Sequence, residues 1–168
     1  MGSENVLQLR KTRELFWNDY LVDMQKSTAF PRLMQPVRKE TCFWFDQGNE
    51  MNLVSYPCIV KDDAGYKMYY LPWEMRKDGT TNGYLAVIES WDGIHWTRPN
   101  LDIFPHPELK ENNVVIDHLV DGVFVFKDEN PNCDPSERYK ALTPLESEGD
   151  RIGGLWCFTS PDGYHFKP

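Results

Sequence analysis

The chain has few of the features that mark nucleic-acid-binding or membrane proteins. Its 168 residues contain 18 Lys and Arg against 26 Asp and Glu, a net charge of −8. A protein that binds a phosphate backbone needs clustered basic residues. No apolar run is long enough to cross a bilayer, and residues 1–13 contain no apolar segment of signal-peptide length. We therefore expect a soluble, cytoplasmic protein that binds neither nucleic acid nor membranes.

The cysteines lack the spacing of a metal site or of a disulfide framework. The chain has four cysteines, and no two of them form a Cys-x-x-Cys pair or a metal-type spacing with the histidines. Cys58 and Cys157 fall in predicted strands, where cysteine commonly serves as a small buried residue. The acidic stretch of residues 127–137 lacks the spacing of a calcium loop. We expect no metal, no cofactor and no disulfide.

What the chain does contain is a repeat. The sequence Ser-Trp-Asp-Gly-Ile-His-Trp at positions 90–96 returns as Ser-Pro-Asp-Gly-Tyr-His-Phe at positions 160–166. Asp-Gly between β-rich runs is typical of a tight hairpin turn, because glycine accepts a positive φ and the carboxylate accepts nearby backbone N–H groups. His95 and His165 occupy equivalent positions, and a repeated residue suits a structural role better than a place in one active centre.

The repeat extends towards the N-terminus as a series of predicted strands. Alternation and apolar runs predict strands at residues 53–60, 66–71, 84–90 and 94–98 in the first copy, and at 122–126, 138–142, 155–159 and 164–167 in the second. Successive four-stranded units are typical of β-propeller blades, which bury their faces against neighbouring blades. The predicted fold class is therefore all-β, with two four-stranded propeller blades.

Two blades are fewer than a closed propeller needs, which is about four to eight. We expect residues 1–168 to be the N-terminal part of one propeller domain, and the remaining blades to come from the same longer chain or from another subunit. Within it, residues 1–52 form an N-terminal segment, residues 53–99 the first blade, and residues 100–168 a connection and the second blade. For residues 15–22 the helical and strand periods both fit, and we favour strands.

Several segments resemble the five-bladed propeller glycosidases. They are residues 56–63, 65–70, 90–96, 112–115, 121–131 and 138–142. This superfamily includes glycoside hydrolase families 32, 43 and 68 and the related family 130 phosphorylases, and the chain is most similar to its family-32-like N-terminal domain branch. The resemblance covers about residues 14–168. It implies a five-bladed propeller that cleaves a terminal sugar, such as a furanoside, by paired carboxylates and without a cofactor.

The resemblance also implies where the carboxylates lie. In that superfamily they converge on the propeller axis from the innermost strands of different blades. Asp121 precedes the first strand of the second blade and takes the place of the transition-state stabiliser, although a turn aspartate is an equally good interpretation. The general acid would come from a third blade, beyond Pro168.

The first blade departs from the family pattern. Ser55 and Tyr56 precede Pro57 where the pattern has an aspartate. Asp46 and Glu50 are acids in the preceding loop, and we choose Glu50 as the candidate base or nucleophile because it lies just before the strand. A solvated loop acid is the alternative interpretation of Glu50.

Sugar recognition suggests further candidates. Aromatic faces stack on sugars while carboxylates and amides bind their hydroxyls. The candidate substrate-binding residues are Trp44, Tyr56, Trp73, Glu74 and His118. Trp73 and Glu74 are predicted to open the loop after the second strand, and His118 is predicted to lie near the axis. Packing between blades is the alternative for the tryptophans, and an ordinary core or surface position is the alternative for His118.

Two other functions fit the same residues. A propeller that binds carbohydrate without cleaving it agrees with the missing first-blade aspartate. A glycoside phosphorylase would need basic residues clustered at the axis to hold phosphate, whereas the Lys and Arg residues of this chain are scattered.

Overall fold

The computed structural model describes residues 9, 11, 13–15, 17–30, 32–50, 52–75, 77–79, 81–105, 112–119, 121–147 and 152–168. The chain divides into two units, Met1–Lys39 and Glu40–Pro168. The division falls before residue 52, where we expected the N-terminal segment to end. Residues 40–50 therefore belong with the sheets that follow them.

The described residues of the first unit form turns and extended chain. The strands expected at residues 15–22 are absent from the described part of that segment, and the expectation was wrong. Polar side chains explain the outcome, because Asn18 accepts a hydrogen bond from the Tyr20 backbone (3.1 Å) and Asp23 accepts one from the Gln25 backbone (3.1 Å). Such local bonds fix turns in place of a sheet ladder.

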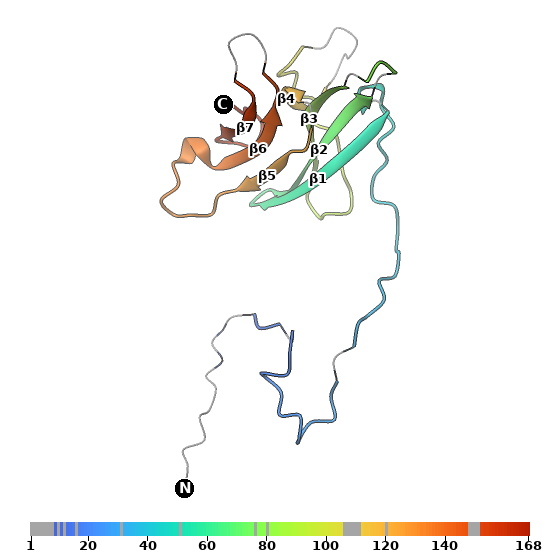
Figure 1. Cartoon of the computed structure of the whole chain (residues 1–168), viewed down its shortest axis with the longest axis vertical. Coiled ribbons are helices and arrows are strands. Elements are labelled where there is room, and N and C mark those ends of the chain that lie inside the picture. The colour runs from blue at the N-terminus through green and yellow to red at the C-terminus, as the bar shows by residue number, and fades with distance from the viewer. Residues whose placement is uncertain are drawn as a thin grey trace. The chain divides into compact units, whose positions relative to one another are not determined.

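The second unit consists of two antiparallel sheets (Figure 1). The first sheet has the order β1 (Leu53–Asp62), β2 (Gly65–Met75), β3 (Thr81–Ser90), β4 (Val114–Leu119), and the second has the order β5 (Phe124–Lys127), β6 (Tyr139–Leu145), β7 (Gly154–Ser160). Two short 3₁₀ helices, η1 (Gly48–Glu50) and η2 (Pro135–Glu137), precede β1 and β6. The predicted all-β class is confirmed. No closed sheet occurs among the described residues, and a propeller stays a prediction.

The tight turn between β1 and β2 follows from two residues. The Asp62 carboxylate accepts the Ala64 backbone N–H (2.9 Å), and Gly65 has a φ of +136°. A Cβ at Gly65 would lie 2.4 Å from the Ser90 carbonyl oxygen of β3. Only glycine meets both requirements, since L side chains rarely adopt this conformation.

The outermost strand of the first sheet is not the one expected. Residues 94–98 contribute a single bridge, in which Glu89 and Thr97 exchange backbone hydrogen bonds of 2.9 and 2.8 Å. The fourth strand is β4, which pairs with β3. The first sheet thus takes a strand from the segment that we assigned to the connection, and the blade boundary at residues 99 and 100 stays a prediction. In the second copy, Thr159 and Lys167 form the same single bridge.

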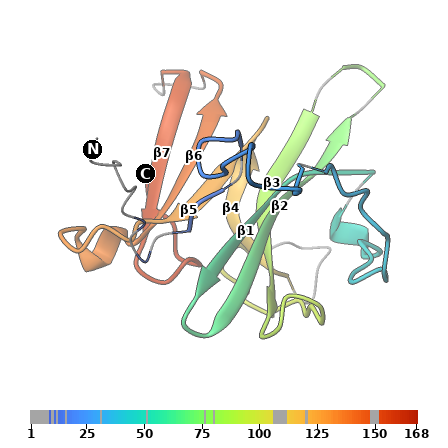
Figure 2. The same ribbon diagram turned by 90° about the horizontal axis from the view of Figure 1, so that it is seen from below.

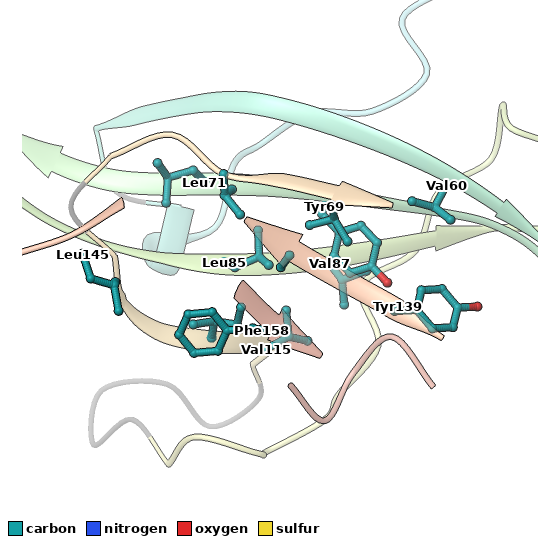
Figure 3. Close-up of a cluster of buried hydrophobic side chains, with 13 residues drawn as sticks. Val60, Tyr69, Leu71, Leu85, Val87, Val115, Tyr139, Leu145 and Phe158 are labelled. Carbon is teal, nitrogen blue, oxygen red and sulfur yellow. The ribbon is translucent and has the colours of Figure 1, made fainter. Parts of the chain in front are cut away.

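The two sheets share one apolar core (Figure 3). We call the side of the first sheet that meets the second sheet its inter-sheet face, and the opposite side its far face. The core contains Val60, Tyr69, Leu71, Leu85, Val87, Val115 and Ile116 from the first sheet, and Val123, Val125, Tyr139, Ala141, Leu145 and Phe158 from the second sheet and the loop before it. In Figure 2, β6 and β7 lie to one side, β2 and β3 to the other, and β4 and β5 between them. Burial of this apolar surface is what holds the sheets together.

The far face of the first sheet is covered by other parts of the second unit. Tyr70, Tyr84, Ala86, Ile88 and Val114 form a second buried cluster there, against which Phe43, Val54, Met68, Trp96 and Phe104 pack. The first sheet is thus buried on both faces, which explains why its strands are apolar on both sides and do not alternate cleanly.

Candidate functional site

An irregularity in β1 presents Tyr56 to solvent. The pairing of β1 with β2 shifts between Ser55 and Cys58, which is a β-bulge, and Pro57 lies inside it. Proline within a sheet is confined to edges and bulges because it cannot donate to the ladder. Tyr56 has a φ of +52° and is 47% exposed. A bulky residue in this conformation stores strain of about 1–3 kcal/mol, an outlier of the kind that clusters at functional sites.

Tyr56 reaches across to the loop before β5. Its hydroxyl donates a hydrogen bond to Asp121 Oδ1 (3.2 Å), which also accepts the Gly122 backbone N–H (2.7 Å). This hydrogen bond is the main reason why the pKa of Tyr56 is raised, followed by the charge of Asp121 and by partial desolvation. A Cβ at Gly122 would lie 3.2 Å from the Tyr56 ring, so the absence of a side chain there leaves room for the ring. Two residues that are far apart in the sequence thus form one exposed pair.

An open groove of about 530 Å³ begins next to this pair, where β1 lies beside β5. Its walls are formed by Pro57, Cys58, Ile59, Val60 and Lys61 on one side, and by Phe124, Val125, Phe126, Lys127 and Glu129 on the other. Ile59 and Phe124 are exposed although they are apolar. The groove combines an apolar and aromatic surface with a few polar groups, which is the usual composition of a small-molecule site. Sequence reasoning missed Phe124 and Phe126.

Glu50, the candidate base, lies elsewhere. It ends η1, is 2% exposed, and its two carboxylate oxygens accept hydrogen bonds from Arg98 (2.9 and 3.0 Å). The Tyr70 hydroxyl (3.1 Å) and the Gln47 backbone N–H (2.9 Å) donate to it as well. Tyr70 belongs to the cluster on the far face of the first sheet. These contacts support a structural role for Glu50, as one half of a buried ion pair.

The other candidate substrate-binding residues do not gather around Asp121. Trp73 and Glu74 lie within β2, not in the loop expected there, because β2 continues to Met75. Trp73 Nε1 is buried and has no hydrogen-bond partner among the described residues. Trp44 is exposed, and its carbonyl accepts a hydrogen bond from Arg98 (2.8 Å).

His118 lies on β4, the strand before the loop that holds Asp121. The strand order places β4 at the opposite edge of the first sheet from β1. β4 pairs with β3 and leads into the loop before β5, and the position of His118 near a propeller axis stays a prediction. The side chain of His118 lies outside what the structure describes.

The two repeated turns have the same network of hydrogen bonds. Asp92 Oδ1 accepts the backbone N–H groups of Ile94 and His95 (both 2.8 Å), and its Oδ2 lies 2.7 Å from His95 Nδ1. Asp162 makes the corresponding contacts with Tyr164 (2.9 Å) and His165 (3.0 and 2.7 Å). This arrangement agrees with the structural role expected for the two histidines.

These contacts also set the pKa of each turn aspartate. The hydrogen bond from the His95 side chain is the largest cause that lowers the pKa of Asp92. Burial raises the pKa of Asp162, but hydrogen bonds from the backbone of His165 and Tyr164 outweigh it and leave the pKa below its ordinary value.

A charged cluster lies at the junction of the two sheets. Lys67 is 7% exposed and binds Asp62 (2.7 Å), while Tyr139 of β6 donates its hydroxyl to the same carboxylate (2.8 Å). The Tyr164 hydroxyl donates to Glu89, and the Tyr164 ring lies 4.7 Å from Lys67 Nζ. Burial raises the pKa of Asp62, but the hydrogen bonds from Lys67 and Tyr139 outweigh burial and hold this pKa below its usual value. The cluster satisfies its own charges and joins the two sheets.

Within the described ranges, no group of three or more His, Cys, Asp or Glu residues could hold a metal ion. The part of the chain that the structure describes also has no helix that is long and apolar enough to span a membrane.

Comparison with known proteins adds no assignment, since no family model, no curated protein and no solved structure matches the chain.

Proposed function

We propose that the chain binds a terminal sugar at the Tyr56–Asp121 pair, as the sugar-holding part of a glycosidase-type propeller. The observation that supports this proposal is the exposed hydrogen bond between the Tyr56 hydroxyl and the Asp121 carboxylate beside an apolar groove. An aromatic ring next to a carboxylate is what a sugar requires, since the ring covers a face of apolar C–H groups and the carboxylate binds hydroxyls.

Asp121 is suited to the role because its orientation is fixed while one oxygen is available. Its Oδ1 accepts hydrogen bonds from Tyr56 and Gly122, and its Oδ2 makes no hydrogen bond within the described ranges. A sugar hydroxyl can therefore donate to Oδ2 without displacing either bond. In a hydrolase the same negative charge would stabilise the oxocarbenium-like transition state that forms at the sugar ring.

Cleavage also requires a second carboxylate, about 5–5.5 Å away in a retaining enzyme or about 6.5–9.5 Å away in an inverting one. The candidate Glu50 is buried against Arg98 and Tyr70, so it is poorly placed to exchange protons with a substrate. We leave the acid and the base unassigned. Because both carboxylate oxygens of Glu50 already accept hydrogen bonds, a second candidate function is carbohydrate binding without cleavage.

The experiment measures binding and turnover separately. Calorimetry and release of nitrophenol from aryl furanosides and pyranosides would be compared for the wild type, Asp121→Asn and Tyr56→Phe, with the exposed Glu137→Gln as the control. For a hydrolase, Asp121→Asn should lower kcat by about 10²–10³-fold. For a binding protein, the wild type should show no turnover, and Asp121→Asn should raise Kd by at least about tenfold through loss of a charged hydrogen bond.

Thermal unfolding of each variant provides the folding control. Asp121 is exposed, so Asp121→Asn should keep the wild-type Tm to within about 2 °C. Wild-type affinity and wild-type activity in Asp121→Asn would exclude Asp121 from the site and defeat the proposal. Equal effects of Glu137→Gln and Asp121→Asn would do the same, because the site would then depend on overall charge alone.

A further inference from the structure

The two sheets repeat each other residue by residue. Lys67 on β2 corresponds to Lys140 on β6, since each lysine binds an aspartate, Asp62 or Asp128, at the end of the preceding strand. The cross-strand partners correspond in the same register, as the pairs Val60 and Phe126, Glu89 and Thr159, Tyr69 and Leu142, Cys58 and Phe124, and Val87 and Cys157. The inter-sheet face of the first sheet therefore has a counterpart on the second sheet.

That counterpart, which we call the open face, is not covered. It consists of Phe124, Phe126, Lys140, Leu142, Pro144, Leu155, Cys157 and Thr159. Phe124 is 57% exposed, Leu155 is 74% exposed, and Cys157 is exposed. The residues that occupy the positions of Leu155 and Cys157 in the first sheet, Leu85 and Val87, are fully buried. A contiguous apolar surface of this kind is unusual on a free protein and marks an interaction site.

We propose that the open face is the docking surface for another antiparallel β-sheet, which packs on it as the second sheet packs on the first. The interface between the two sheets shows the chemistry that such a partner needs. At the centre, Val125, Ala141 and Phe158 are buried in one apolar cluster with Leu85 and Val87. At one end, Tyr139 donates its hydroxyl to Asp62. The partner sheet should therefore present apolar residues at its centre and a tyrosine at the end that meets Asp128.

The charged pair on the open face supports this requirement. Lys67 and Asp62 are both buried under Tyr139 and Tyr164. Lys140 and Asp128 form the corresponding pair, but their side chains are partly exposed, and no tyrosine in the described part of the chain donates to Asp128. An ion pair in this position needs a covering residue that satisfies the remaining carboxylate lone pairs, and a tyrosine hydroxyl does so in the first sheet.

A second copy of the chain is not the expected occupant. The second sheet packs on the first through the side that carries Tyr139 and Ala141. These residues align with Tyr66 and Met68 on the far face of the first sheet. In a second copy, the far face would therefore have to cover the open face. The far face is already covered by Phe43, Trp96 and Phe104. The described residues of the first unit contain no strand, and they offer no sheet either. Phe124 and Phe126 also line the groove, so a sheet on the open face would border the groove, but the docking proposal rests on burial and charge and uses no property of sugar binding.

Cys157 and Cys42 allow a direct test, since both thiols are exposed but only Cys157 lies on the open face. Each thiol would be alkylated with iodoacetamide and quantified by peptide mass spectrometry in two samples: protein isolated from its natural source without denaturant, called the native sample, and the purified 168-residue chain. We expect similar rates for both thiols in the purified chain. In the native sample, Cys157 should react at least about ten times more slowly than in the purified chain, whereas Cys42 should react equally fast in both.

A matched pair of variants tests whether the protection of the Cys157 thiol comes from a partner on the open face. Leu155→Asp places a charge on the face, and Ile152→Asp places one at an exposed residue just outside it. With the variants produced in the natural source, Leu155→Asp should restore the reactivity of Cys157 in the native sample and Ile152→Asp should not, while both variants of the purified chain keep the wild-type Tm to within about 2 °C.

Three results would overturn the proposal. The first is an equal rate for Cys157 in the native sample and in the purified chain. The second is protection of Cys157 in the chain alone together with a doubled mass by light scattering, which would assign the face to a second copy. The third is a photocrosslinker attached to Cys157 that captures a helix or a segment without the alternating pattern of a strand.

Discussion

The two sheets have the same strand pattern and the same turn motif, but they are stabilised differently. The first sheet is buried on both faces, by the second sheet on one side and by Phe43, Trp96 and Phe104 on the other. The second sheet is buried on one face, while Phe124 and Leu155 remain exposed on the other. A repeat of sequence therefore does not give a repeat of environment, because each sheet depends on whatever neighbour covers it.

The repeated turns show the same contrast. The turn around Gly163 lies against the first sheet, where Tyr69 donates its hydroxyl to the Gly163 carbonyl (2.9 Å) and Tyr164 donates to Glu89. The turn around Gly93 makes hydrogen bonds within itself, and a Cβ at Gly93 would meet the Tyr66 ring at 3.6 Å. The internal network makes the turn, and the external contacts of the second copy join the sheets.

The largest expected effect comes from the ion pair of Glu50 and Arg98, beside the residues that pack on the far face. In Glu50→Gln, the Arg98 guanidinium loses its buried carboxylate partner, so the free energy of unfolding should fall by about 3–5 kcal/mol. The position of Arg98 in the second repeat is Pro168, so no such pair exists there. The measurement is urea unfolding followed by tryptophan fluorescence.

Asp46→Asn is the matched control, since Asp46 also binds Arg98 (3.1 Å) but is exposed. It should cost less than about 1 kcal/mol, because an exposed ion pair contributes little. Equal losses of unfolding free energy in Glu50→Gln and Asp46→Asn would show that Glu50 does not stabilise the packing on the far face. Glu50 would then again be a candidate reactive group.

A smaller effect should separate the two repeated turns. Gly93 and Gly163 have nearly the same positive φ, +79° and +80°. Alanine at either position should therefore cost about 1–2 kcal/mol from the left-handed backbone alone. At Gly163 the added Cβ would also lie 2.5 Å from the Tyr69 hydroxyl, whereas at Gly93 the nearest atom is 3.6 Å away. Overpacking should add about 1–3 kcal/mol to the cost of Gly163→Ala.

Chemical denaturation of the two alanine variants gives this difference directly. The strain of the backbone cancels between them, so the excess loss in Gly163→Ala reports the contact between the turn and the first sheet. Identical free energies of unfolding would mean that Tyr69 moves aside without cost, and the turn would then contribute nothing to the junction of the sheets.

Local features of the fold could be predicted from the sequence, and contacts between distant residues could not. The Asp-Gly turns and most strands were correct because a turn requires only a few neighbouring residues. β4 was missed because it pairs with β3 across a long connection that contains no hairpin signal. The partner of Glu50 is Arg98 and that of Tyr56 is Asp121. Neither pairing leaves a pattern in one sequence.

The smallest expected effect concerns Tyr139, which covers Asp62. No equivalent tyrosine covers Asp128 on the open face in the described part of the chain. Tyr139→Phe removes the hydroxyl that donates to Asp62 and should lower the free energy of unfolding by about 0.5–1.5 kcal/mol at neutral pH. The corresponding residue in the first sheet, Tyr66, makes no hydroxyl hydrogen bond within the described ranges, so Tyr66→Phe is the control and should be nearly neutral.

The pH dependence gives this last comparison its sharpest form. Because the folded-state pKa of Asp62 lies below its unfolded value of about 3.9, the stabilisation is fully present above that pH and is lost as the pH falls through the folded pKa. The gap in stability between the wild type and Tyr139→Phe should therefore be widest above about pH 5 and should narrow below about pH 4. Urea unfolding between about pH 2.5 and about pH 7, a range that brackets the unfolded pKa of about 3.9, measures this gap. A gap that stays constant across this range would mean that Tyr139 acts by packing alone, and that a partner sheet would need no tyrosine opposite Asp128.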